Sequence, residues 1–159
     1  MSNFEFKRLR RTIIIFRVVQ ALLLGLLVFM ALNFQQIFYM GGKPELFFSS
    51  ITAALVIQLI LFYPVYRLAK RDAGVEFESS AIGLTAEDLK AFRKKRLLGD
   101  LWKFAGITFY VSFVVFVPDA KIAPGVSPVL ATTIFSFLMS GLAYFQCFNY
   151  SAKKRMNLV

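Results

Sequence analysis

The chain has 159 residues, of which 58% are hydrophobic and only 18% are charged, and its mean hydropathy is +0.64. A soluble domain carries about 45–50% apolar and about 25% charged residues. The composition therefore excludes a disordered chain, a collagen and a disulfide scaffold, and it favours a protein whose solvent is lipid.

The residue types that carry most enzyme chemistry are scarce. The sequence has no His and a single Cys, Cys147. The commonest metal ligand and the usual acid–base group near neutral pH are therefore missing, and no intrachain disulfide can form. No phosphate-binding, zinc-protease or serine-nucleophile motif occurs either. We predict no catalytic residue, no cofactor and no metal site, and we expect the chain not to be an enzyme.

Four apolar segments are long enough to cross a bilayer, which takes about 20 helical residues. In chain order they are residues 13–38, 46–66, 101–117 and 129–150. The first follows a basic start, but its apolar run exceeds the core of a signal peptide, about 7–15 residues. We therefore expect a retained anchor. The prediction is an all-α integral membrane protein with one four-helix transmembrane domain over residues 1–159.

Basic residues gather on one side of the predicted membrane. Of the 19 Lys and Arg residues, 17 lie at the start of the first helix, around the connection between the second and third spans, or after the fourth span. The positive-inside rule then places both termini in the cytoplasm. The same rule explains the net charge of +10 without nucleic acid. Small size and simplicity favour a bacterial inner membrane.

The predicted cytoplasmic connection, residues 67–100, has two parts. Residues 72–80 are acidic and rich in small side chains, so we expect a loop. Thr85 then caps a predicted basic, amphipathic helix from 86 to about 98, which suits the surface of an anionic inner leaflet. The alternative is a linker whose charges only set topology. The candidate headgroup contacts are Lys90, Arg93, Lys94, Lys95 and Arg96.

Few polar residues lie deep in the spans. No ionisable group does, which argues against a proton-coupled pump. The amide of Gln58 needs a partner in hydrocarbon, and counting places Ser112 and Ser136 at a similar depth. The polar residues in the spans therefore have two possible roles: they form hydrogen bonds between packed helices, or they line a small pore. The full candidate set is Gln58, Ser112, Thr132, Ser136 and Ser140.

Small residues spaced four apart allow helix backbones to approach closely. The spans contain such pairs at Ala21 and Gly25, at Ser49 and Ala53, at Ser50 and Ala54, and at Ser136 and Ser140. In addition, Phe6 and Tyr66 flank the first predicted hairpin as Phe92 and Tyr150 flank the second. The two hairpins are either a tandem repeat or ordinary membrane hairpins with interfacial aromatic residues.

Three functions fit these features. The leading hypothesis is a non-catalytic structural or accessory subunit that packs against itself or against other membrane subunits. The alternative is a homo-oligomeric channel, or a passive small-solute transporter, lined by the polar residues of the second and fourth helices. The third hypothesis is a lipid-handling enzyme or carrier at the cytoplasmic face, and it rests only on the basic helix of residues 86–98.

Overall fold

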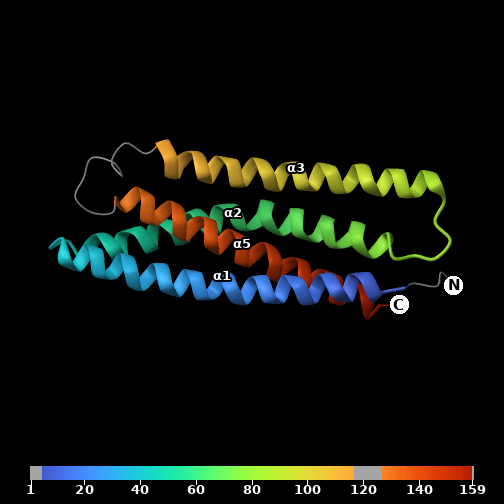
Figure 1. Ribbon diagram of the computed structural model, residues 1–159, viewed down its shortest axis with the longest axis horizontal. Helices are drawn as coiled ribbons and strands as arrows, with labels where there is room; N and C mark the ends of the chain where they lie inside the picture. Colours follow the sequence, from blue (N-terminus) through green and yellow to red (C-terminus); the bar gives the residue numbers. More distant parts are fainter. Residues whose placement is uncertain (1–4, 117–126, 159) are drawn as a thin grey trace.

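The computed structural model describes residues 5–116 and 127–158, which form four long helices with short connections (Figure 1). The helices are α1 (Lys7–Met40), α2 (Glu45–Glu78), α3 (Ala86–Phe116) and α5 (Pro128–Met156). All four are long and apolar enough to cross a membrane. This confirms the all-helical architecture with four helices able to span a bilayer. Most of the predicted connection before α5 lies outside the described residues.

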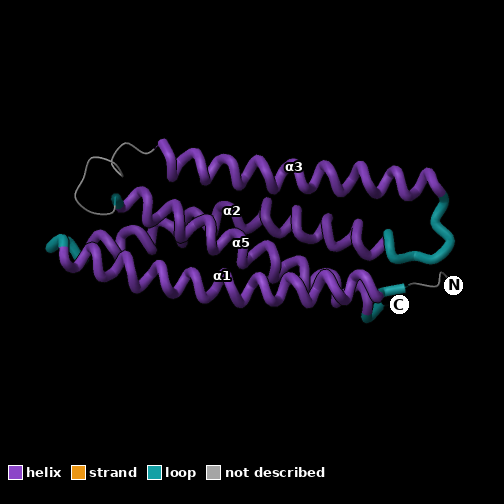
Figure 2. The backbone as a smooth tube through the Cα atoms, viewed as in Figure 1, coloured by secondary structure: helices purple, strands orange, loops and turns teal. Residues whose placement is uncertain are grey.

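The helices alternate in direction, so the two chain termini and the α2–α3 connection lie at the same end of the bundle (Figure 2). We call this the basic end; there α1 begins at Lys7, α2 ends at Glu78, α3 begins at Ala86 and α5 ends at Met156. The opposite end holds the tight turn between Met40 and Glu45.

The connection differs from the prediction at residues 72–80. The prediction of a loop there is wrong, because α2 continues to Glu78. Acids one turn apart, Asp72 and Glu76, face basic residues of α3 there, which the sequence pattern alone does not reveal. The basic segment 86–98 is helical, and it runs without a break into the third span as the first part of α3. Thr85 caps it as predicted, since the backbone N–H of Asp88 donates to the Thr85 hydroxyl over 3.1 Å.

The buried core joins α1, α2 and α5. One cluster lies toward the basic end and contains Leu9 of α1, Ala69 and Ala73 of α2, and Phe148 of α5. A second cluster lies toward the opposite end. It consists of Phe34, Phe38, Phe47, Ala54, Ala131 and Phe135. Neither cluster includes α3, in which Gly99 is the only buried residue, whereas α5 has ten buried residues. The structure is therefore a three-helix core with α3 at its side.

Small residues permit the close packing of α2 on α5. Ser50 is 1% exposed and Ala54 is fully buried, and both lie on the side of α2 that meets α5. The pair one position earlier, Ser49 and Ala53, is exposed. Only one of the two predicted small pairs on α2 is thus a packing seam, as expected for a helix that shows one face to its neighbour.

Substitution of these neighbouring alanines separates packing from lipid exposure. We expect Ala54→Leu to destabilise the bundle by about 1–3 kcal/mol, because extra methylenes in a packed core force the backbones apart. The matched control is Ala53→Leu, in which the same side chain enters an exposed position. The thermal unfolding midpoint in detergent measures both effects. Equal midpoints for the two variants would contradict the described packing of α2 on α5.

Candidate functional site

The polar residues predicted in the fourth span lie along one line of α5 and meet two different helices. At the opposite end from the termini, the Thr132 hydroxyl donates to the backbone oxygen of Ser50 in α2 over 3.3 Å. One turn further, the Ser136 hydroxyl lies 3.0 Å from the hydroxyl of Tyr110 in α3. Ser136 is only 1% exposed, so this hydrogen bond satisfies a group that lipid or water does not reach.

The line continues toward the basic end with two further contacts to α2. The Ser140 hydroxyl donates to Oε1 of Gln58 over 3.0 Å. The Tyr144 hydroxyl donates to Oδ2 of Asp72 over 2.6 Å. The expectation that Gln58 pairs with Ser112 or Ser136 is wrong, because depth in the membrane does not say which way a side chain faces. We refer to Thr132, Ser136, Ser140 and Tyr144 together as the α5 polar ridge.

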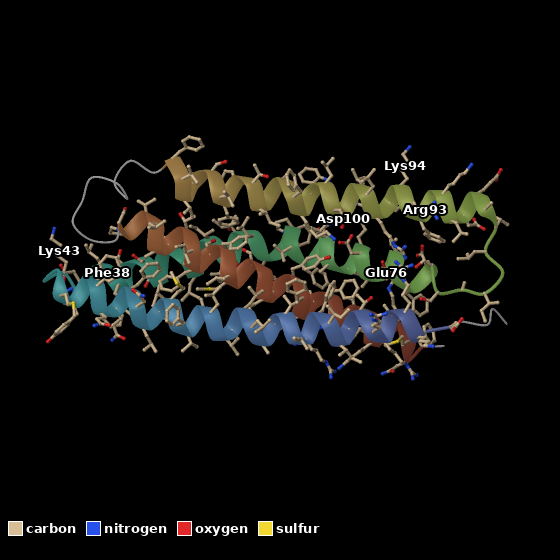
Figure 3. The ribbon with its side chains drawn as sticks, in the orientation of Figure 1. Phe38, Lys43, Glu76, Arg93, Lys94 and Asp100 are labelled. Carbon is tan, nitrogen blue, oxygen red and sulfur yellow. The ribbon has the colours of Figure 1, made fainter. Side chains whose placement is uncertain are left out.

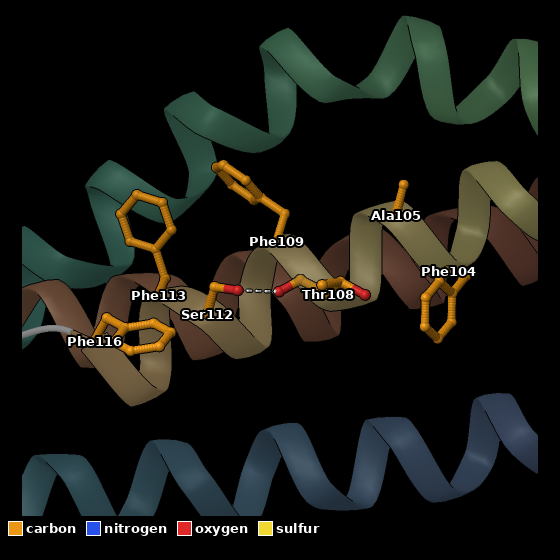
Figure 4. Close-up of a pocket in the computed structure, with 7 residues that line it drawn as sticks. All are labelled: Phe104, Ala105, Thr108, Phe109, Ser112, Phe113 and Phe116. Atoms are coloured by element: carbon orange, nitrogen blue, oxygen red, sulfur yellow. Dashed lines mark hydrogen bonds between the residues drawn. The ribbon is translucent and has the colours of Figure 1, made fainter.

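Ser112, which is half-buried, lies apart from this ridge on α3 (Figure 4). Its hydroxyl donates to the backbone oxygen of Thr108 in the preceding turn over 2.8 Å. The surrounding hollow, of about 800 Å³, is lined by residues of α3 alone. They are Phe104, Ala105, Thr108, Phe109, Ser112, Phe113 and Phe116. The hollow is thus apolar, and its two hydroxyl-bearing residues give it little polar character.

A polar cluster between α1 and α5 is absent from the sequence-based candidates. Gln20 of α1 donates to Oε1 of Gln146 over 3.0 Å and accepts from Nδ2 of Asn149 over 2.8 Å. Asn149 is 5% exposed. Gln20 interrupts a long apolar run, which is the one signal that points to the cluster. Gln146 and Asn149 lie close to the basic C-terminal segment, where polar residues are unremarkable in sequence.

Two acids of α2 hold α3 at the basic end. The side chain of Asp72 is 11% exposed, and its Oδ2 atom lies 3.3 Å from Nζ of Lys103. The same ammonium group lies 2.6 Å from Oδ1 of Asp100, one turn away on α3, as the spacing predicts. Lys103 therefore bridges a carboxylate of its own helix and a carboxylate of α2.

One turn further along α2, Glu76 binds Arg96 through both of its carboxylate oxygens. Nε of Arg96 lies 2.8 Å from Oε1, and Nη2 lies 3.1 Å from Oε2. The Nη2 contact is a hydrogen bond, whereas the Nε contact is an ion pair without hydrogen-bond geometry. The Arg96 guanidinium also donates to the Ser79 hydroxyl over 2.6 Å, and Nε of Arg8 from α1 lies 3.8 Å from Glu76. Three helices thus meet at the Glu76 carboxylate.

The predicted headgroup contacts do not all point the same way. Lys90, Arg93, Lys94 and Lys95 are exposed, and Figure 3 shows Lys94 directed away from the bundle. Arg96 instead faces α2, where Glu76 neutralises it. Four of the five basic side chains are therefore available to lipid, and the fifth holds α3 to α2.

The described acids do not converge on a metal-binding geometry: residues 5–116 and 127–158 contain no group of three His, Cys, Asp or Glu side chains placed to hold an ion. Asp72 and Glu76 each serve an ion pair between helices. The two carboxylates therefore pair with basic side chains of α3 and hold neighbouring helices together.

The comparisons with known proteins assign the chain to no group: no protein-family model matches it, and neither a curated protein nor a solved structure matches it.

Close contact at Gly99 tests how α3 is held. A Cβ atom at this position would lie 2.6 Å from Oδ1 of Asp72, whose carboxylate is already held by Tyr144 and Lys103. We expect Gly99→Ala to displace α3 and to destabilise it by about 1–3 kcal/mol. The fluorescence of Trp102, the only Trp in the chain and a residue of α3, reports the change during thermal unfolding.

The matched control is Gly106→Ala on the same helix, where an added Cβ meets nothing within 4 Å. Removal of a helical glycine there contributes up to about 1 kcal/mol of helix stability. The control should therefore unfold at the same temperature as the parent protein or slightly above it. Equal unfolding temperatures for Gly99→Ala and Gly106→Ala would contradict the close contact between α3 and Asp72.

Proposed function

We propose that the chain is a non-catalytic subunit of a membrane assembly, which packs through its helices against other membrane subunits or against a second copy of itself. The observation that carries this proposal is the exposure of α3. Gly99 is its only buried residue, while Phe104, Phe109 and Phe116 are 67%, 59% and 77% exposed. Aromatic side chains on one helix offer a large contact area to the helix of another subunit.

The α5 polar ridge supports a packing role over a pore. Ser140 and Gln58 bind each other, and Ser136 binds Tyr110, so these groups are engaged between helices. The alternative, a homo-oligomeric channel or passive transporter, needs the same groups to face water. Hydrogen bonds within one subunit favour the first role because they already satisfy the side chains.

We further propose that both termini are cytoplasmic, that the exposed basic side chains of residues 86–98 contact an anionic inner leaflet, and that the membrane is a bacterial inner membrane. The support is the distribution of charge: both termini and the α2–α3 connection lie at the basic end (Figure 1), near 17 of the 19 basic residues of the sequence. The positive-inside rule assigns such an end to the cytoplasm.

The mass of the complex isolated in mild detergent tests the subunit proposal. We expect the tagged full-length chain to elute with other membrane chains, or as a homo-oligomer, and we expect Phe109→Ala with Phe113→Ala to reduce the recovered partner at least severalfold. Phe29→Ala, at an exposed position of α1, is the control. A monomer that recovers no partner under conditions where it remains folded would contradict the proposal.

Gln58→Leu distinguishes packing from conduction. Loss of one interhelical hydrogen bond in a membrane costs about 0.6 kcal/mol on average, so we expect a small decrease in thermal stability and unchanged, background solute flux in liposomes. Ser140→Ala removes the other partner of the same hydrogen bond and should have a similar effect. A flux that is present in the parent protein and altered by Gln58→Leu would support the channel instead.

A further inference from the structure

The outer face of α1 at the basic end carries cations without an anionic partner in the described part of the chain. Lys7, Arg10 and Arg11 are exposed, and no described carboxylate lies within salt-bridge distance of them. Arg8 differs, because it lies nearer to α2 and its Nε atom is 3.8 Å from Glu76. Lys7, Arg10 and Arg11 therefore place unpaired positive charge on the side of α1 that faces away from the other helices.

A hollow of about 730 Å³ lies on this face. It is lined by Glu5, Phe6, Lys7, Arg10, Arg11, Ile14 and Ile15. Glu5 is the only acid in the lining, so three cations and one anion give the hollow a formal charge of +2. The part of the hollow at Lys7, Arg10 and Arg11 is thus cationic, and the part at Ile14 and Ile15 is apolar.

The apolar part continues into the membrane along the same face. Ile14, Val18 and Leu22 follow one another at intervals of four residues and are 61%, 56% and 68% exposed. From Arg11 to Leu22 the helix rises by about 16 Å. This is close to half of the hydrocarbon core of about 30 Å, which is the depth of one leaflet.

We propose that this face of α1 binds one anionic phospholipid of the adjacent leaflet. Arg10 and Arg11, with Lys7, hold the headgroup phosphate, and an acyl chain lies along Ile14, Val18 and Leu22. Arginine is suited to this role because its planar guanidinium offers two parallel donors to a phosphate. The site lies on the opposite side of the bundle from the exposed cations of α3 (Figure 3).

The C-terminal cations show why charge alone does not define the site. Lys153 and Lys154 are also exposed at the basic end. The large exposed hydrophobic side chains on α5 are Val129 and Tyr150 only, so no apolar track continues into the membrane beneath these lysines. A lipid there would find a headgroup contact but no surface for its acyl chain.

Fluorescence quenching in vesicles locates the lipid, because the chain has a single Trp, Trp102. In the full-length Trp102→Phe protein, Ile14→Trp places an indole in the hollow, and Tyr150→Trp places one beside Lys153. Phosphatidylglycerol and phosphatidylcholine with brominated acyl chains are the quenchers. We expect about fivefold or greater preference for phosphatidylglycerol at position 14, since each basic side chain contributes on the order of a severalfold preference, and little preference at position 150.

The added variant Arg10→Gln with Arg11→Gln should abolish the preference at position 14, and Lys153→Gln with Lys154→Gln should leave it intact. Inorganic phosphate should not relieve the quenching, because the acyl chain also contributes. Equal quenching by both lipids at position 14, or equal preference at positions 14 and 150, would overturn the proposal. Both outcomes are read in proteins that retain every arginine, so they do not depend on the folding of the charge variants.

Discussion

Hydrocarbon offers no hydrogen-bond partners, and this constraint arranges the interior of the bundle around one face of α5. The α5 polar ridge recurs every four residues, so its hydroxyl groups emerge along a single line. Helices α2 and α3 satisfy that line by lying on either side of it, α2 at Gln58 and Asp72 and α3 at Tyr110. A single hydrogen bond of this kind contributes only about 0.6 kcal/mol. The α5 polar ridge therefore determines which helices pack against α5, and in what register, more than it increases the stability of the bundle.

The four helices are held together by two kinds of interaction. Helices α1, α2 and α5 share buried apolar clusters at both ends, whereas α3 is held mainly through the ion pairs of Asp72 and Glu76, together with the hydroxyl contact of Tyr110 and the packing of its ring on Phe137. Partly solvated ion pairs contribute modestly and weaken with salt. Helix α3 is consequently the element that we expect to separate from the others at the lowest cost in free energy. That property suits the proposed contact of α3 with another subunit.

How much follows from sequence depends on which physical signal each residue carries. Apolar runs predict the four spans because membrane thickness sets their length. The helical state of Asp72 and Glu76 does not follow, since an acidic, small-residue stretch indicates a loop until Lys103 and Arg96 are known to face it. Similarly, counting gives the depth of Gln58 but not the direction of its side chain, so it does not identify Ser140, itself a predicted polar residue, as the partner of Gln58. The four-residue period of the α5 polar ridge is visible in sequence, but its partners belong to helices far along the chain.

The two outer surfaces of the bundle differ in the partner that they favour. Helix α3 exposes rings whose hollow contains only two hydroxyl groups, each able to bond within its own helix, so neither requires charge from a partner. Helix α1 combines unpaired cations with an apolar track of one leaflet's depth, and an anionic phospholipid complements both parts. Since α1 and α3 lie on opposite sides of α2 and α5 (Figure 1), a subunit bound to α3 leaves the α1 face in contact with lipid. The proposed lipid site on α1 and the proposed assembly surface of α3 therefore lie apart on the same bundle and do not compete.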